Sequence, residues 1–171
     1  MKEPNQIIDG RRARLVDSGV VDYWVRYLAR QPHHVFAVID PARDPSLLKK
    51  FTCEPIVPEL GAFGPHVTVA NDELVTRAWG NASAIFAVCS YPMTALVQHC
   101  ARLFESQLET GEEIYFRFYD PRVLRAVARV CDEDERLELL GPVHSFLVED
   151  RVATYAHDIS RAGITGVGVP A

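Results

Sequence analysis

The sequence lacks the short motifs that identify many enzymes. It contains no phosphate-binding GxxxxGK loop, no GxGxxG turn, no GxSxG elbow and no HExxH helix. Its four cysteines form no CxxC pair, and they do not stand at zinc-ligand spacing from the histidines. These absences exclude the enzyme classes that such motifs identify, and the sequence indicates no metal site and no cofactor.

Lysine is also scarce, with three lysines against fifteen arginines, and the net charge of the 171 residues is −5. Phosphate binding needs clustered Lys and Arg, so this balance argues against nucleic acid as a partner. The charge is uneven, because residues 1–50 carry nine basic and six acidic groups, a net +3. The remaining residues carry nine basic and seventeen acidic groups, a net −8, which predicts two faces of different charge.

The chain also lacks a sequence typical of a secretory signal or a membrane span. The first six residues are polar, with no apolar core after a basic region. The longest stretch without Asp, Glu, Lys or Arg covers residues 78–101, but it contains Asn, Ser, Gln and Pro, which predict a strand, a turn and a helix. We therefore expect a cytoplasmic protein with reduced cysteines and no membrane partner.

Hydrophobic periodicity predicts helices that alternate with strands. The predicted helices cover residues 17–31, 46–51, 72–79, 92–110, 121–130 and 133–140. The predicted strands cover residues 34–39, 66–70, 84–89, 114–119 and 143–149, and residues 152–157 are a candidate hairpin partner. This alternation predicts an α/β fold with a mixed, mainly parallel sheet of about five strands flanked by helices. The expected organisation is a polar basic arm (1–16), a single domain (17–157) and a flexible tail (158–171).

The strongest local feature is the turn that joins the strand at 114–119 to the next helix. Here Arg117, Tyr119, Asp120, Pro121 and Arg122 stand close together. In one interpretation, the two arginines hold an anionic group or the carboxylate of a partner. In the other, Asp120 caps the helix, Pro121 occupies its first position, and an arginine pairs with the aspartate to lock the turn.

Two further residues follow the strand at 34–39, namely Asp40 and Arg43. If the two strands are parallel, these side chains converge with the turn at one edge of the sheet, where α/β proteins bind ligands. In the helix at 121–130, the spacing predicts that Val123, Leu124, Val127 and Val130 are buried. It also predicts that Arg122, Arg125 and Arg129 line the opposite face.

The stretch FRFYDPRVLRAVARVCDEDERLELLGPVHSFLVED, residues 116–150, resembles the family of type VI secretion adaptors or chaperones, long catalogued as a domain of unknown function. Its pattern is a strand that ends in FRFYDPRV, a helix, a short acidic helix, then Gly-Pro-Val and a strand. Weaker pieces agree in order: residues 38–43, Trp79-Gly80, and His99 with Arg102. The resemblance spans about residues 30–150.

The resemblance implies a non-enzymatic, cytoplasmic bacterial protein that binds a toxic effector and helps to load it onto the VgrG spike. The effector and VgrG are then its partners, and the residues of the resemblance include no established catalytic group. Two alternatives stay open on the residues themselves. One is a small ligand-binding or catalytic domain that uses the turn at 117–122. The other is an immunity protein that neutralises a toxin.

Overall fold

The computed structural model describes residues 7–8, 11–12 and 16–170. The basic arm predicted at residues 1–16 falls almost entirely outside them. From that arm, the backbone of two short paired strands is described, β1 (Ile7–Ile8) and β2 (Arg11–Arg12). The side chains of residues 1–15, with the arm's charges, lie outside the described residues.

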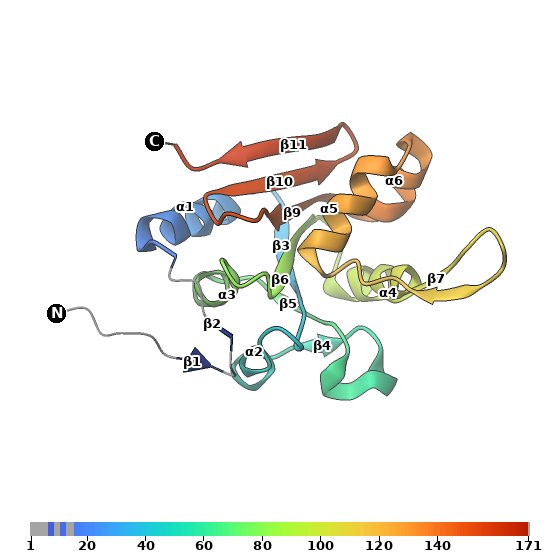
Figure 1. The fold of residues 1–171 in the computed structure, drawn as a ribbon, viewed down its shortest axis with the longest axis horizontal. Coiled ribbons are helices and arrows are strands. Elements are labelled where there is room, and N and C mark those ends of the chain that lie inside the picture. The colour runs from blue at the N-terminus through green and yellow to red at the C-terminus, as the bar shows by residue number, and fades with distance from the viewer. Residues whose placement is uncertain (1–6, 9–10, 13–15, 171) are drawn as a thin grey trace.

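A seven-stranded sheet forms the centre of the molecule, in the order β11-β10-β9-β6-β3-β5-β4 (Figure 1). Its strands are β3 (His34–Ile39), β4 (Glu54–Pro55), β5 (His66–Val69), β6 (Ala84–Cys89), β9 (Val143–Glu149), β10 (Tyr155–Ser160) and β11 (Gly163–Gly168). Every neighbouring pair is antiparallel. The predicted mainly parallel sheet of about five strands is therefore wrong.

Helices cover both faces of this sheet. One side carries α1 (Ser18–Ala29), α2 (Ser46–Lys50) and α3 (Asp72–Ala78). The other carries α4 (Met93–Phe104), α5 (Pro121–Val130) and α6 (Glu133–Leu140), as Figure 1 shows. A 3₁₀ segment, η1 (Pro58–Phe63), joins β4 to β5. The three layers agree with the predicted flanking helices.

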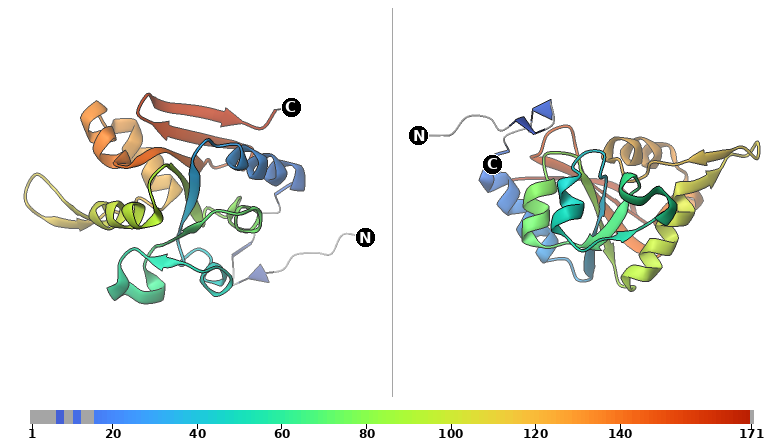
Figure 2. Two further views of the ribbon diagram at one scale, coloured as in Figure 1. Left: turned by 180° about the vertical axis from the view of Figure 1, so that it is seen from behind. Right: turned by 90° about the horizontal axis from the view of Figure 1, so that it is seen from below.

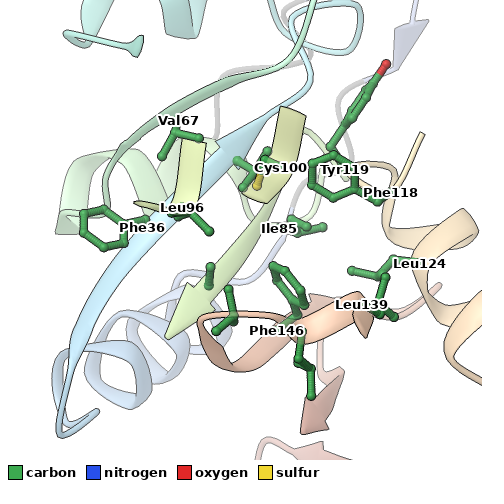
Figure 3. Packing of buried hydrophobic residues seen from close by; sticks show 14 of the residues in the cluster. Phe36, Val67, Ile85, Leu96, Cys100, Phe118, Tyr119, Leu124, Leu139 and Phe146 are labelled. Carbon is green, nitrogen blue, oxygen red and sulfur yellow. The ribbon is translucent and has the colours of Figure 1, made fainter. Parts of the chain in front are cut away.

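Burial on both faces explains the error in strand direction. Successive residues of β3, β6 and β9 enter opposite clusters. Phe36 and Ile85 pack towards α4–α6 (Figure 3), while Ala37 and Phe86 pack towards α1–α3. Continuous apolar runs of this kind are typical of parallel sheets. They record that both faces are covered, but they contain no information on strand direction.

A helix can connect two parallel strands of this sheet although no two neighbouring strands are parallel. Both β5 and β6 are antiparallel to β3, which lies between them. The two strands are therefore parallel to each other but do not touch, and α3 connects them. Residues 78–101 form the end of α3, then β6 and most of α4, as predicted. Among the described residues, we find no helix with the length and hydropathy needed to cross a membrane.

Two predicted elements end early. The helix predicted to reach residue 110 ends at Phe104, and β7 (Glu105–Gln107) then pairs with β8 (Glu113–Tyr115). This hairpin projects from the body in Figures 1 and 2. The strand predicted over 114–119 ends at Tyr115, and the buried residues Phe118 and Tyr119 lie in a turn that the N–H of Asp120 closes on the carbonyl of Arg117.

The flexible tail predicted at residues 158–171 is also corrected, because β10 and β11 form a regular hairpin through it. Within β11, Ile164 packs against the cluster below α4–α6 and Val167 against the opposite one. The ring of Tyr155 lies where a side chain at Gly166 would stand, so this glycine gives the ring its place. A glycine in this segment, Gly166, thus allows close packing of the hairpin.

Two tryptophans fasten α1 and α3 to the loop between β9 and β10. The rings of Trp24 and Trp79 stack with centroids 4.5 Å apart, and both are almost fully buried. Both indole N–H groups donate to the carbonyl oxygen of Ala153, at 2.7 and 2.9 Å. Next to Trp79, the N–H of Gly80 donates to the carboxylate of Glu149 at 2.7 Å.

We predict that Trp79→Phe lowers the free energy of unfolding by about 1–2 kcal/mol, because the hydrogen bond is lost while most of the ring is kept. Trp24→Ala should cost more, about 3–5 kcal/mol, because it also opens a cavity. Urea unfolding of both variants measures these values. A Trp79→Phe protein as stable as the wild type would contradict the role of the shared carbonyl.

Candidate functional site

Two buried carboxylates form the centre of the site, at the end of the sheet where β3 stops. Asp40 is 1% exposed and Asp120 is 2% exposed. Asp40 follows β3 directly, and its N–H donates to the carbonyl of Ser83 at 2.8 Å. Its carboxylate accepts a hydrogen bond from the N–H of Ala42 at 3.0 Å and one from Arg117 at 3.2 Å. Each oxygen of Asp40 thus has a donor.

Asp120 caps α5. Its carboxylate accepts the backbone N–H of Arg122 at 2.9 Å, and the guanidinium of Arg122 adds two bonds, at 3.0 and 2.6 Å. The guanidinium of Arg43 also lies 3.8 Å from this carboxylate. Pro121 occupies the first helical position, where its missing N–H costs nothing. The cap, the proline and the arginine pair agree with the interpretation of this turn as a locked helix start.

Arg117 connects this turn to the hydrophobic core. Its guanidinium lies 5.6 Å from the centre of the Tyr119 ring, while it also pairs with Asp40. Tyr119 is buried beside Phe118, and its hydroxyl points away from the cluster (Figure 3). Burial raises the pKa of Tyr119, an effect that the charge of Arg117 partly opposes.

The structure therefore brings together all of the site residues that the sequence indicated. They are Asp40, Arg43, Arg117, Tyr119, Asp120, Pro121 and Arg122. The reason differs from the predicted one, because β8 belongs to the separate β7–β8 hairpin and runs beside no strand of the main sheet. The segment after β8 brings Arg117 and Asp120 to the end of β3 instead.

The electrostatics of the site favour a structural role. Burial alone would raise the pKa of Asp120, but its hydrogen bonds with Arg122 and the charges of Arg122 and Arg43 lower it overall. Asp120 is thus ionised and neutralised within the chain. A catalytic carboxylate would need an open side, whereas these two face their own arginines.

Sequence reasoning missed a second group of charges, beneath α5. Arg125, predicted on the exposed face, is 8% exposed; it donates to the carbonyl of Glu149 and lies 3.8 Å from Asp150. Asp150 also pairs with His157 at 3.2 Å. By contrast Val130, predicted to be buried, is 82% exposed. The residues that α5 buries are Pro121, Leu124, Arg125 and Ala128, which share helical spacing once the arginine is accepted as a core residue.

The side chain of His99 packs against Gly141, the first residue of the Gly-Pro-Val segment. The imidazole is buried and bonds to the carbonyl of Leu139 at 3.0 Å. A side chain at Gly141 would collide with this ring, and the residue has a φ of +52°. Burial lowers the pKa of His99. The histidine is therefore a neutral packing residue that fixes α4 against the end of α6.

Within the described part of the chain, no group of three His, Cys, Asp or Glu side chains is arranged to hold a metal ion. The four cysteines are free, and burial raises the pKa of each thiol. They are protonated thiols with low nucleophilicity at neutral pH.

We predict that Asp120→Ala lowers the free energy of unfolding by about 1–2 kcal/mol through loss of the helix cap. Asp120→Asn should lose less, because an amide oxygen can still accept the N–H of Arg122. Chemical denaturation at neutral pH compares the two variants. If both were as stable as the wild type and yet lost partner binding, the turn would be a binding site and not a structural lock.

We also predict that this stabilisation disappears in acid. The pKa of Asp120 is lower in the folded chain than its ordinary value of 3.8, so the unfolded chain takes up the proton first as the pH falls. The contribution is complete above that ordinary value and is lost as the pH falls through the folded one. The stability difference between wild type and Asp120→Asn should therefore shrink on acidification, measured by urea unfolding from neutral pH to pH about 3. A constant difference would show that the charge of Asp120 contributes nothing.

Comparison with known proteins adds one finding. Residues 57–138 match the model of a family described as "Domain of unknown function (DUF4123)". The match covers the segment from η1 through most of α6 and includes Arg117, Asp120 and Arg122, whereas Asp40 and Arg43 precede it. Neither the curated proteins nor the solved structures give a match. The central part of the chain is thus similar to a family whose description states no function.

Proposed function

We propose that this protein is a non-enzymatic adaptor that binds a toxic effector and helps to load it onto the VgrG spike of a type VI secretion system. The observation that carries the proposal is the resemblance of residues 116–150 to such adaptors, together with the match of residues 57–138 to the DUF4123 model. The two overlap over the FYDPRV turn and α5.

The geometry of that turn supports a scaffold over an active site. Both carboxylates are buried and bonded to arginines of the same chain, so neither is open to a substrate. This is the arrangement that distinguishes an internal lock from the ligand-binding or catalytic alternative. An adaptor acts through its surface. The locked turn joins the β7–β8 hairpin to α5 and so holds these two surface elements in place.

Exposed apolar side chains support a role in protein binding. Phe63, in η1, is 90% exposed, and Tyr115, on the projecting β7–β8 hairpin, is 77% exposed. Large exposed aromatic side chains cost free energy in water and are enriched at protein interfaces. They are candidates for contacts with an effector or with VgrG.

The proposal predicts a stable complex without turnover. Co-expression with the toxin and the VgrG protein encoded beside it, followed by affinity purification and size-exclusion chromatography, should recover the partners together. The double variant Phe63→Ser/Tyr115→Ser should recover less of at least one of them, with an unchanged melting temperature. Glu59→Gln/Glu113→Gln, on the same two elements, is the matched control.

The activity of the captured toxin separates the remaining alternative. A toxin that is as active with this protein bound as without it agrees with an adaptor. A toxin whose activity is abolished by binding would instead identify an immunity protein. Failure to recover any secretion component would contradict both.

A further inference from the structure

The outer face of α1 carries a hollow that shares no residue with the site described above. Its volume is about 480 Å³, and Tyr23, Arg26, Tyr27, Arg30 and Gln31 line it. We infer that this hollow binds an acidic segment of a partner protein, with carboxylates placed on Arg26 and Arg30. The inference goes beyond the proposed function, since it names the chemistry of a partner, and it rests on that function only for the identity of the partner.

The aromatic part of the hollow is held in place from below. Tyr23 and Tyr27 stack with ring centroids 6.2 Å apart, and each meets the buried Trp24 edge-on, at 5.0 and 5.7 Å. Gln31 donates to the backbone carbonyl of Tyr27 at 3.1 Å. A surface whose rings are already fixed loses little entropy when a partner packs on it.

The charged part of the hollow is free to bind. Within the described part of the chain, Arg26 and Arg30 have no hydrogen bond or ion pair through their guanidinium groups. They differ in this from the arginines of the turn, each of which faces a carboxylate. Spaced four residues apart, they lie one helical turn from each other and can bind two carboxylates of one segment.

Charge complementarity selects a protein over a nucleic acid. Two arginines neutralise too few phosphates for strong binding to nucleic acid, and the chain as a whole carries −5. Tyrosine with arginine is instead the composition of strong contacts between proteins. Burial, and after it the negative charge of Asp158, raises the pKa of Tyr27, so the tyrosine end of the hollow disfavours a further carboxylate. We therefore expect the partner's carboxylates beside the arginines and its apolar side chain at the tyrosines.

The position of the hollow suits a protein with two partners. α1 lies on the side of the sheet opposite α4–α6 and the β7–β8 hairpin (Figures 1 and 2). A partner at α1 therefore leaves the opposite layer open to a second one.

The test uses the full chain and a short synthetic peptide rich in glutamate with a central leucine. In ¹⁵N-labelled protein, titration with this peptide should shift the amide signals of residues 23–31. Arg26→Glu/Arg30→Glu should weaken binding roughly tenfold, the sum of two exposed ion pairs. Arg102→Glu/Arg129→Glu changes the net charge equally, on exposed arginines of α4 and α5, and should bind as the wild type does.

Several outcomes would overturn the inference. They are signals that shift mainly outside α1, equal loss of binding in both charge-reversed variants, and equal binding of the same peptide with glutamine in place of glutamate. Tighter binding of a single-stranded oligonucleotide at α1 would also overturn it, in favour of nucleic acid.

A second measurement separates this inference from the proposed function. If the toxin complex forms equally well with Arg26→Glu/Arg30→Glu and with wild type at low salt, α1 is not the contact surface and the inference fails, while the adaptor function stands. If the peptide binds α1 but no secretion component is recovered, the adaptor function fails and the acidic-segment site stands.

Discussion

The burial of three central strands on both faces is the constraint on which the rest of this structure depends. β3, β6 and β9 present apolar side chains to both sides, so neither face of the sheet can be left to water. Helices must then cover both sides, and the connections between the central strands supply most of them. The long excursion between β6 and β9 supplies α4, α5 and α6, while the shorter connections supply α2 and α3.

The charged residues fasten those layers where apolar packing ends. Asp40 with Arg117, and Arg43 with Asp120, join the end of β3 to the start of α5. Arg125 ties α5 to the end of β9, and Gly80 ties the end of α3 to Glu149. Removal of one member of a buried pair leaves the other charge without compensation. The short pieces of sequence that resemble the adaptor family lie far apart along the chain. They include residues that form these bridges, namely Asp40, Gly80 and Arg117.

Local features of the fold could be predicted from the sequence, whereas pairing between distant strands could not. The helix predicted over 133–140 is α6, where Asp132 and Glu135 form a capping box, and the apolar run at 84–89 is β6 with the predicted bounds. These features depend on neighbours within a few residues. Strand direction depends on which elements meet across the molecule, and the apolar runs were equally compatible with a parallel sheet. Arg125 was misplaced because its long aliphatic stem packs inward while its charge bonds to Glu149, which a simple division into polar and apolar residues cannot express.

The site also depends on contacts between distant parts of the chain, but here the prediction that its residues converge was correct. The sequence placed Asp40, Arg43, Arg117 and Asp120 together on the assumption of parallel strands, and they do meet, although that assumption is wrong. Their side chains match each other in charge, and the buried carboxylates require partners wherever the chain leads them. Once these four are paired, their charges cancel and give little to a partner. Because these four charges sum to zero, the net charge of −5 is carried by other residues of the chain. In the hollow on α1 the lining is positive, because Arg26 and Arg30 stand there beside two fixed tyrosine rings. Over the helix as a whole, Asp17 and Asp22 balance these two charges.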